Sequence, residues 1–128
     1  MAEAHRGGCL CGAVRYRVDG PLREVIVCHC SVCRRTHGAP AAFTACARGQ
    51  LELEQASDLR WHEHDGARRG FCAVCGSRLF WDRGRATISI AAGSVDEPTG
   101  LTTSHHIYTA SAGDWYDVPP GRPAATAG

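Results

Sequence analysis

Short stretches in which apolar and polar residues alternate recur along the chain, separated by glycine, proline and aspartate. A period of two residues is typical of a strand with one buried side, and the separating residues are typical of turns. The pattern predicts strands at Ala13–Val18, Glu24–Val27, Ala42–Ala47, Leu51–Glu54, Leu59–His64, Arg78–Trp81, Ala86–Ala91 and His106–Thr109. Strands at this spacing favour an antiparallel sheet or a sandwich.

One short helix is expected among these strands. Residues Ser31–His37 provide one or two helical turns, which Gly38 and Pro40 would end. Residues 119–128 are rich in Pro, Ala and Gly and have little to bury. We therefore expect a single domain at 1–118, followed by a disordered tail at 119–128.

The composition limits how this chain can be stabilised. Only 22 of the 128 residues are Leu, Val, Ile or Phe, a fraction that would indicate disorder in a highly charged chain, but the net charge is only +1. The low charge also argues against nucleic-acid binding, because no basic excess is available to neutralise phosphates. So small a core needs another source of stability, and the eight cysteines are the obvious candidate.

The cellular compartment decides whether these cysteines form disulfides or bind metal. The first eight residues contain no apolar stretch typical of a secretory signal, and no later stretch is long and apolar enough to span a membrane. We therefore expect a cytoplasmic protein without a membrane span. In such a protein, clustered cysteines are interpreted as metal ligands, with disulfides as the alternative.

Two distant pairs of cysteines have the spacing of metal ligands. Cys9 and Cys11 form C-x-C, which places both side chains on one face of an extended segment. Cys72 and Cys75 form C-x2-C, a tight turn for which Gly76 supplies the glycine. Four thiolates would make a closed, structural zinc site. If the pairs share one ion, the fold must bring them together, and the metal would contribute to the free energy of folding.

A third group contains three cysteines. Cys28, Cys30 and Cys33 would leave one coordination position open for water or substrate, which is typical of a reactive metal site. Arg34 and Arg35 follow directly and are candidates for binding the carboxylate of a thiol substrate. The alternative is that both arginines are simply solvated.

Two further residues are candidate ligands. Cys46 stands alone in an apolar run and is interpreted as a core residue, with a role as fourth ligand of the three-cysteine group as the alternative. His29 lies between Cys28 and Cys30, so in an extended segment it points to the opposite face.

Together these motifs resemble a known family. The motifs are, in order, Gly8-Cys9-x-Cys11-Gly12-Ala13-Val14-Arg15-Tyr16; Cys28-His29-Cys30-Ser31-x-Cys33-Arg34-Arg35; Phe71-Cys72-x-x-Cys75-Gly76-Ser77-x-Leu79-Phe80-Trp81; and His106-Ile107-Tyr108 with Trp115-Tyr116. They resemble the glutathione-dependent formaldehyde-activating enzyme family, also called the centromere protein V-like family. The resemblance runs from about Gly7 to Asp117, and the arrangement of three cysteine clusters is highly specific.

The resemblance carries implications for fold and metal. It implies a mainly β, antiparallel β-tent fold similar to the Mss4-like proteins, with one short helix. It implies a structural zinc and a second, catalytic zinc. The implied ligands are Cys9, Cys11, Cys72 and Cys75 for the structural zinc, and Cys28, Cys30 and Cys33 for the second.

The resemblance also implies an activity. It suggests a carbon–sulfur lyase that joins formaldehyde to a small thiol, glutathione, to give S-hydroxymethylglutathione. Zinc would lower the pKa of the thiol and hold the thiolate beside the aldehyde. The alternative is a non-catalytic zinc-binding structural or interaction module, for which the three-cysteine group has no evident use. The sequence leaves the identity of the thiol and the oligomeric state open.

Overall fold

The computed structural model describes residues 4–120, and within this range the chain forms ten strands, one α-helix and three 3-10 helices. The strands are β1 (Ala4–Gly8), β2 (Arg15–Asp19), β3 (Val25–Cys28), β4 (Ala41–Ala47), β5 (Leu51–Gln55), β6 (Leu59–His64), β7 (Ala67–Cys72), β8 (Arg78–Asp82), β9 (Thr87–Ala91) and β10 (Thr103–Ile107). The helices are α1 (Ser31–His37), η1 (Arg48–Gln50), η2 (Ala92–Ser94) and η3 (Thr109–Ser111).

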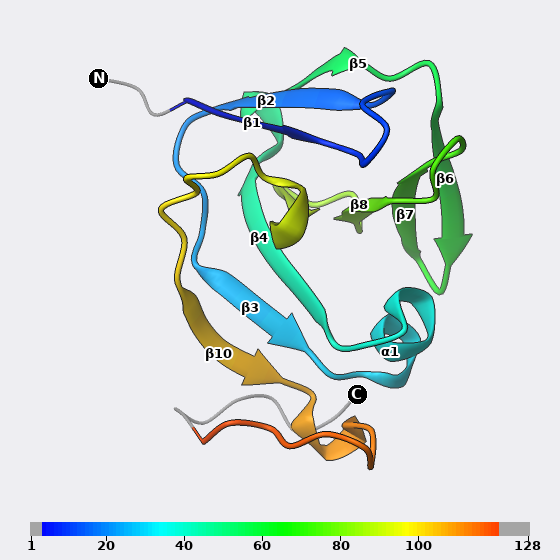
Figure 1. The fold of residues 1–128 in the computed structure, drawn as a ribbon, viewed down its shortest axis with the longest axis vertical. Helices are drawn as coiled ribbons and strands as arrows, with labels where there is room; N and C mark the ends of the chain where they lie inside the picture. Colours follow the sequence, from blue (N-terminus) through cyan, green and yellow to red (C-terminus); the bar gives the residue numbers. More distant parts are fainter. Residues whose placement is uncertain (1–3, 121–128) are drawn as a thin grey trace.

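The strands are arranged in two sheets. A three-stranded sheet has the order β1-β2-β5, and a seven-stranded sheet has the order β10-β3-β4-β9-β8-β7-β6. Figure 1 shows the small sheet above and the large sheet bending around the interior, with β3, β4 and β10 on one side and β6 and β7 on the other. Helix α1 lies between these two arms, at the end away from the small sheet. A cavity lies against the large sheet, and Val32 and Cys33 of α1 are among the residues that line it.

The predicted class, a mainly β fold with one short helix, is confirmed. Helix α1 has the predicted bounds because the Cys30 sulfur caps its first turn and Gly38, with φ of 76°, ends it. Among the described strands the pairing is antiparallel with one exception, because β10 pairs with β3 in parallel. The last strand also begins three residues earlier than predicted, at Thr103.

Two strands that the pattern did not predict are β1 and β7. Neither alternates in hydrophobicity, because β1 reads AHRGG and β7 reads ARRGFC. Strand β7 is held by pairing on both sides, with β6 and with β8. Backbone pairing and packing therefore override weak local propensity in β7, as is common for strands.

The core consists of two clusters of buried side chains. The larger one includes Tyr16, Leu79, Phe80 and Ile90, with the Tyr16 and Phe80 rings in edge contact at 5.4 Å between centroids. The smaller one contains Phe43 and Ala41 together with two cysteines. Each cluster thus has few large apolar side chains, in keeping with the composition.

The strand register shows which side chains lie on each of the two faces of the large sheet. Gly70, Phe80 and Ile90 lie opposite one another on β7, β8 and β9, and both Phe80 and Ile90 are buried in the larger cluster. The adjacent row along these strands is Arg69, Trp81 and Ser89. Because side chains alternate between faces, that row points the other way and lines a cavity.

Only the beginning of the predicted tail, 119–128, falls among the described residues. Pro119 and Pro120 are exposed and outside regular structure, and the rest of the predicted tail lies beyond the described range. Within residues 4–120, no helix combines the length and apolar character needed to cross a bilayer.

Candidate functional site

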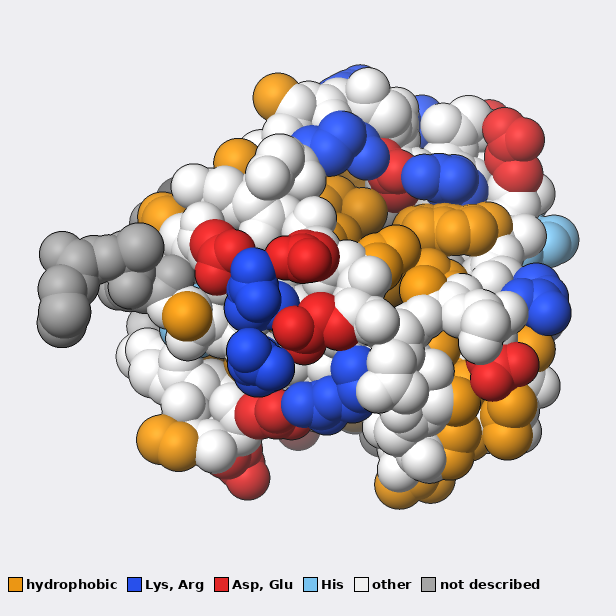
Figure 2. All heavy atoms as spheres, turned by 90° about the horizontal axis from the view of Figure 1, so that it is seen from above, with side chains coloured by type: hydrophobic (Ala, Val, Ile, Leu, Met, Phe, Trp, Pro, Cys, Tyr) orange, Lys and Arg blue, Asp and Glu red, His pale blue; other side chains and the backbone are white. Residues whose placement is uncertain are grey.

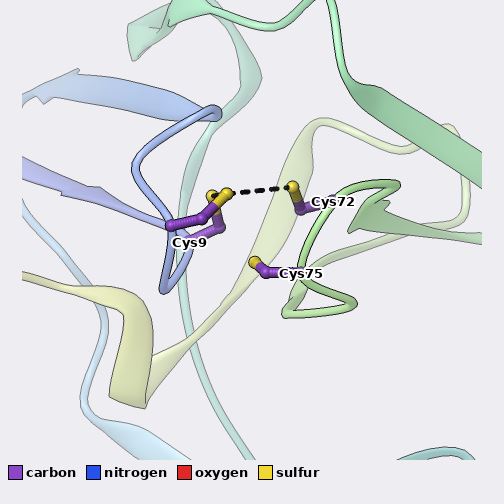
Figure 3. Close-up of side chains that lie close together, drawn as sticks. Cys9, Cys72 and Cys75 are labelled. Atoms are coloured by element: carbon purple, nitrogen blue, oxygen red, sulfur yellow. Dashed lines mark hydrogen bonds between the residues drawn. The ribbon is translucent and has the colours of Figure 1, made fainter.

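The first group of cysteines brings together two distant parts of the chain. The sulfurs of Cys9, Cys11, Cys72 and Cys75 all lie within 4.8 Å of one another. The Cys9 and Cys11 sulfurs are 3.6 Å apart, and the Cys11 and Cys72 sulfurs are 3.8 Å apart across 61 positions of sequence. Figure 3 shows Cys9 facing Cys72 and Cys75 across the gap between the β1–β2 loop and the β7–β8 turn.

Local backbone structure holds each half of this group in place. The backbone N–H of Val14 donates to the Cys9 sulfur at 3.2 Å, and the loop from Cys9 to Val14 is closed by a second bond from the Cys9 N–H to the Val14 carbonyl at 3.1 Å. On the other side, Gly76 has φ of 78°, and its N–H donates to the Cys72 carbonyl at 2.8 Å. Positive φ favours glycine, so the predicted role of Gly76 in the C-x2-C turn is confirmed.

Ser77 joins the two halves. Its hydroxyl oxygen accepts a hydrogen bond from the Leu10 N–H at 3.0 Å, and its hydroxyl donates to the Cys75 sulfur at 3.2 Å. The hydrogen bonds from the side chain and backbone of Ser77 lower the pKa of Cys75 to about 5. Cys75 is therefore prepared to act as a thiolate ligand.

The geometry of the first group fits a tetrahedral metal ion. Bonds of about 2.3 Å to zinc place neighbouring sulfurs roughly 3.8 Å apart. The measured separations of 3.6 and 3.8 Å are close to this value. Cys9 and Cys72 are buried within the larger core cluster, so an ion here would join the β1–β2 loop and the β7–β8 turn to the core.

The second group comprises Cys28, Cys30 and Cys33, whose sulfurs also lie within 4.8 Å of one another. Cys28 is the last residue of β3, Cys30 caps α1 by accepting the Cys33 N–H at 3.3 Å, and Cys33 lies in the first turn of that helix. The strand-to-helix junction therefore turns all three side chains to one place. Three thiols on one side fit a metal ion with a further position for another ligand.

Charge within the second group is unevenly distributed. The hydrogen bond from the Cys28 thiol lowers the pKa of Cys33 to about 5, assisted by the Arg69 guanidinium, whose Nη2 lies 3.6 Å from the Cys33 sulfur. The same hydrogen bond and burial raise the pKa of Cys28. Cys33 therefore becomes a thiolate before Cys28 does.

A cavity of about 510 Å³ adjoins the second group. All three cysteines line it, together with apolar side chains from both arms of the large sheet, among them Phe43 and Trp81. The first group does not line this cavity. The second group therefore differs from the first in that its cysteines line an open space.

The other sequence candidates lie outside the second group. Arg34 and Arg35 are on α1 but do not line the cavity, and Arg35 is exposed. Cys46 is buried in the larger core cluster and belongs to neither cysteine group. His29 is buried facing away from the cavity wall and forms hydrogen bonds with Tyr116 at 3.0 Å and with His106 at 2.8 Å.

Four arginines that were not among the candidates predicted from the sequence do line the cavity. They are Arg23, Arg69, Arg83 and Arg85. Arg69 lies on β7, where no strand was predicted. A signal was available, because Asp65-Gly66 follows the predicted strand Leu59–His64 and is a strong two-residue hairpin turn. Both residues have positive φ, 53° and 79°, as such a turn requires.

Comparison with known proteins identifies the family of this chain. A model of the family described as glutathione-dependent formaldehyde-activating enzyme matches residues 4–111. The match spans most of the chain, so the protein belongs to this family. The chain is also similar to a Rhodobacter sphaeroides protein of known crystal structure, with 23% identity and a TM-score of 0.61 over 79% of this chain and 98% of the other. At that identity the likeness concerns the fold alone.

Proposed function

We propose that the protein is a zinc-dependent enzyme of the carbon–sulfur lyase type, which joins a small cytoplasmic thiol such as glutathione to an aldehyde such as formaldehyde. Membership of the family supports this activity as a class. The observation that carries the proposal is the position of Cys28, Cys30 and Cys33 at the wall of a cavity large enough for a small substrate.

Zinc is the metal that suits both groups of thiols, and the sulfur spacing fits it. Cys9, Cys11, Cys72 and Cys75 would hold a structural ion, and Cys28, Cys30 and Cys33 would hold a second one. When bound at the second group, zinc supplies a Lewis acid that lowers the pKa of a thiol substrate. In the overall reaction the thiol sulfur bonds to the aldehyde carbon, and the thiol proton passes to the aldehyde oxygen.

The chain's own residues prepare the cavity for this reaction. Arg69 offsets the negative charge of the Cys33 thiolate, because its guanidinium lies against that sulfur. Trp81 and Phe43 provide apolar walls that exclude water from part of the cavity. A confined thiol and aldehyde would react faster because they are held together.

Direct observation of adduct formation by exchange NMR tests the proposal. We expect the zinc-loaded protein to accelerate the reaction of formaldehyde with glutathione or another small thiol above the uncatalysed rate. Cys30→Ser should abolish the acceleration. Cys46→Ala is the matched control, because Cys46 lies in neither group, and it should retain full activity. No acceleration by the parent protein with any of several thiols would contradict the proposal.

A non-catalytic zinc module is the second candidate, because Cys9 and Cys72 of the first group are buried in the larger core cluster, which favours a purely structural role for an ion there. Metal analysis separates the two functions. Protein purified without chelator should contain about two zinc ions per chain if the second group is a working site. One ion per chain, together with no acceleration, would favour the module.

A further inference from the structure

Arg69 is a buried cation with an unpaired donor. Only 8% of the residue is exposed, and it lines the cavity. Its Nη2 donates to the Cys33 sulfur, but its Nη1 is buried without a hydrogen-bond partner. An unpaired buried donor on a charged group is costly, so folded proteins contain few of them. Arg69 therefore has one nitrogen bonded to the cysteine group and one that lacks a partner within the described part of the chain.

The sheet register places Arg69 beside an apolar part of the cavity wall. Arg69 lies opposite Trp81 on the neighbouring strand β8, and both line the cavity. Arg83, two residues beyond Trp81, places its guanidinium 5.4 Å from the centre of the Trp81 ring. The wall thus combines a deep guanidinium, an indole face and a second guanidinium nearer the solvent.

The charge around the cavity is unbalanced. Four guanidinium groups line it, from Arg23, Arg69, Arg83 and Arg85, against the single carboxylate of Asp65. Within the described residues, none of the four forms an ion pair with a carboxylate. The nearest approach of Arg83 to Asp65 is to the backbone carbonyl, at 3.3 Å.

Five of the described arginines elsewhere on the molecule form ion pairs with carboxylates. Figure 2 shows acidic and basic side chains interspersed over the small sheet, where Arg17 meets Glu52 at 2.6 Å and Arg6 meets Glu54 at 3.3 Å. Arg48 and Arg68 share Asp82. The cavity thus gathers four arginines that lack such a partner among the described residues around one open space.

We propose that Arg69 binds the carboxylate of a small organic acid in the cavity, with its Nη1 as the anchoring donor, beside the Cys28, Cys30 and Cys33 group. This inference rests on the proposed function and names its substrate class, a thiol that carries a carboxylate. A guanidinium matches a carboxylate in shape and charge, and the apolar wall accommodates the carbon chain. Arg23, Arg83 and Arg85 raise the local concentration of anions at the cavity.

Binding of methylthioacetate and of its neutral methyl ester tests the inference without any reaction. The methyl group on sulfur prevents thiolate formation in both probes, so they differ in the carboxylate charge and in the one methyl group of the ester. In NMR titrations of the zinc-loaded chain at constant ionic strength, we expect the acid to bind about tenfold more tightly than the ester, the effect of one charge-assisted hydrogen bond. The side-chain nitrogen signals of Arg69 should shift with the acid and not with the ester.

Three variants test which arginine causes the tighter binding of the acid than of the ester. Arg69→Met should reduce the preference for the acid to less than about twofold, since its thioether cannot donate a hydrogen bond. Arg34→Gln and Arg35→Gln are the matched controls on α1 and should keep the preference. Loss of the preference in either control, with Arg69→Met unchanged, would overturn the assignment. If Arg69→Met does not fold, the nitrogen shifts of the parent protein decide the matter.

The remaining outcomes are also informative. Equal binding of acid and ester by the parent protein, or tighter binding of inorganic phosphate than of methylthioacetate, would overturn the carboxylate assignment. A preference for the acid in a protein that fails to accelerate adduct formation would support this inference and contradict the proposed reaction. Equal acceleration of adduct formation for a thiol acid and for its ester would support the proposed reaction and contradict this inference.

Discussion

The hydroxyl oxygen of Ser77 accepts a hydrogen bond from the backbone N–H of Leu10, 67 positions away in the sequence, at 3.0 Å. Because the same hydroxyl donates to the Cys75 sulfur, one side chain links the β1–β2 loop to the β7–β8 turn, the two segments that carry the first cysteine group. Leu10 itself is 89% exposed, so this contact comes from its backbone and not from burial of its side chain. Ser77 therefore helps to position the sulfurs of the first cysteine group without belonging to it.

Replacing Ser77 with Ala should weaken metal binding at the first group. Loss of a residue that orients metal ligands typically costs about 10- to 100-fold in metal affinity. Competition with a chromophoric chelator measures the change. Ser94→Ala is the matched control, because it removes the buried hydrogen bond from Tyr16 at 2.7 Å without touching either cysteine group. Equal metal affinity in Ser77→Ala and the parent protein would contradict this role.

The two cysteine groups should respond differently to the loss of one sulfur. Cys72 is fully buried in the larger core cluster, so Cys72→Ser should remove the ion that joins distant segments and abolish cooperative unfolding. Cys30→Ser should leave the chain folded, because serine is itself a good cap for α1. Thermal unfolding and metal analysis of both variants check this. Identical behaviour would show that the division into structural and reactive groups is wrong.

Asp82 should make the stability depend on pH in the acid range. Its side chain is 2% exposed, and hydrogen bonds from Arg48, the Gly84 N–H and Arg68 hold the pKa of this carboxyl well below its usual range. Because the pKa is lower in the folded state, the stabilisation is present above the ordinary Asp value of about 4 and is lost as the pH falls below it.

Asp82→Asn should therefore be less stable than the parent protein by about 2 kcal/mol at neutral pH. The difference should shrink steadily below pH of about 4. Urea unfolding of both proteins over this range measures it, and taking the difference at each pH removes the metal-dependent part that they share. A difference that is constant with pH would contradict the role of the Asp82 charge.

Tyr116 should hold the segment after β10 against the end of β3. Its hydroxyl accepts a hydrogen bond from the Gly113 N–H at 3.0 Å and contacts the buried His29 Nδ1 at 3.0 Å. Tyr116→Phe should increase amide hydrogen exchange in residues 109–117 by about tenfold, the effect of losing one buried hydrogen bond. Trp115→Phe, at a residue that is 61% exposed, is the control and should leave exchange nearly unchanged. Unaltered exchange in Tyr116→Phe would contradict the prediction.

Much of the fold and of the cysteine grouping could be predicted from the sequence, because both depend on local chemistry. Helix α1 follows from its own cap and its terminal glycine. The C-x-C and C-x2-C spacings indicate shared ligation whatever the rest of the chain does. Strand β1 could not be predicted in this way, since it is defined by pairing with β2 and contains no alternating apolar residues.

The arginines of the cavity were missed for a related reason. Arg34 and Arg35 were chosen because they follow Cys33 directly, but successive residues of a helix point in different directions, so neighbours in sequence need not face the same space. Arg69 is 36 positions from Cys33 and meets it only because β7 pairs between β6 and β8. Such a contact depends on sheet order, which residue patterns alone do not determine.

Strand β7 carries Arg69 near its centre and ends at Cys72, so three residues of one extended segment connect the two cysteine groups. Pairing with β6 runs along this whole segment, and pairing with β8 reaches Phe71 across a register shift between Gly70 and Phe71. The strand that presents Arg69 to the Cys33 sulfur is therefore anchored at its end by the first cysteine group. If both groups hold zinc as proposed, loss of the first ion would also loosen the contact that favours a thiolate at the second.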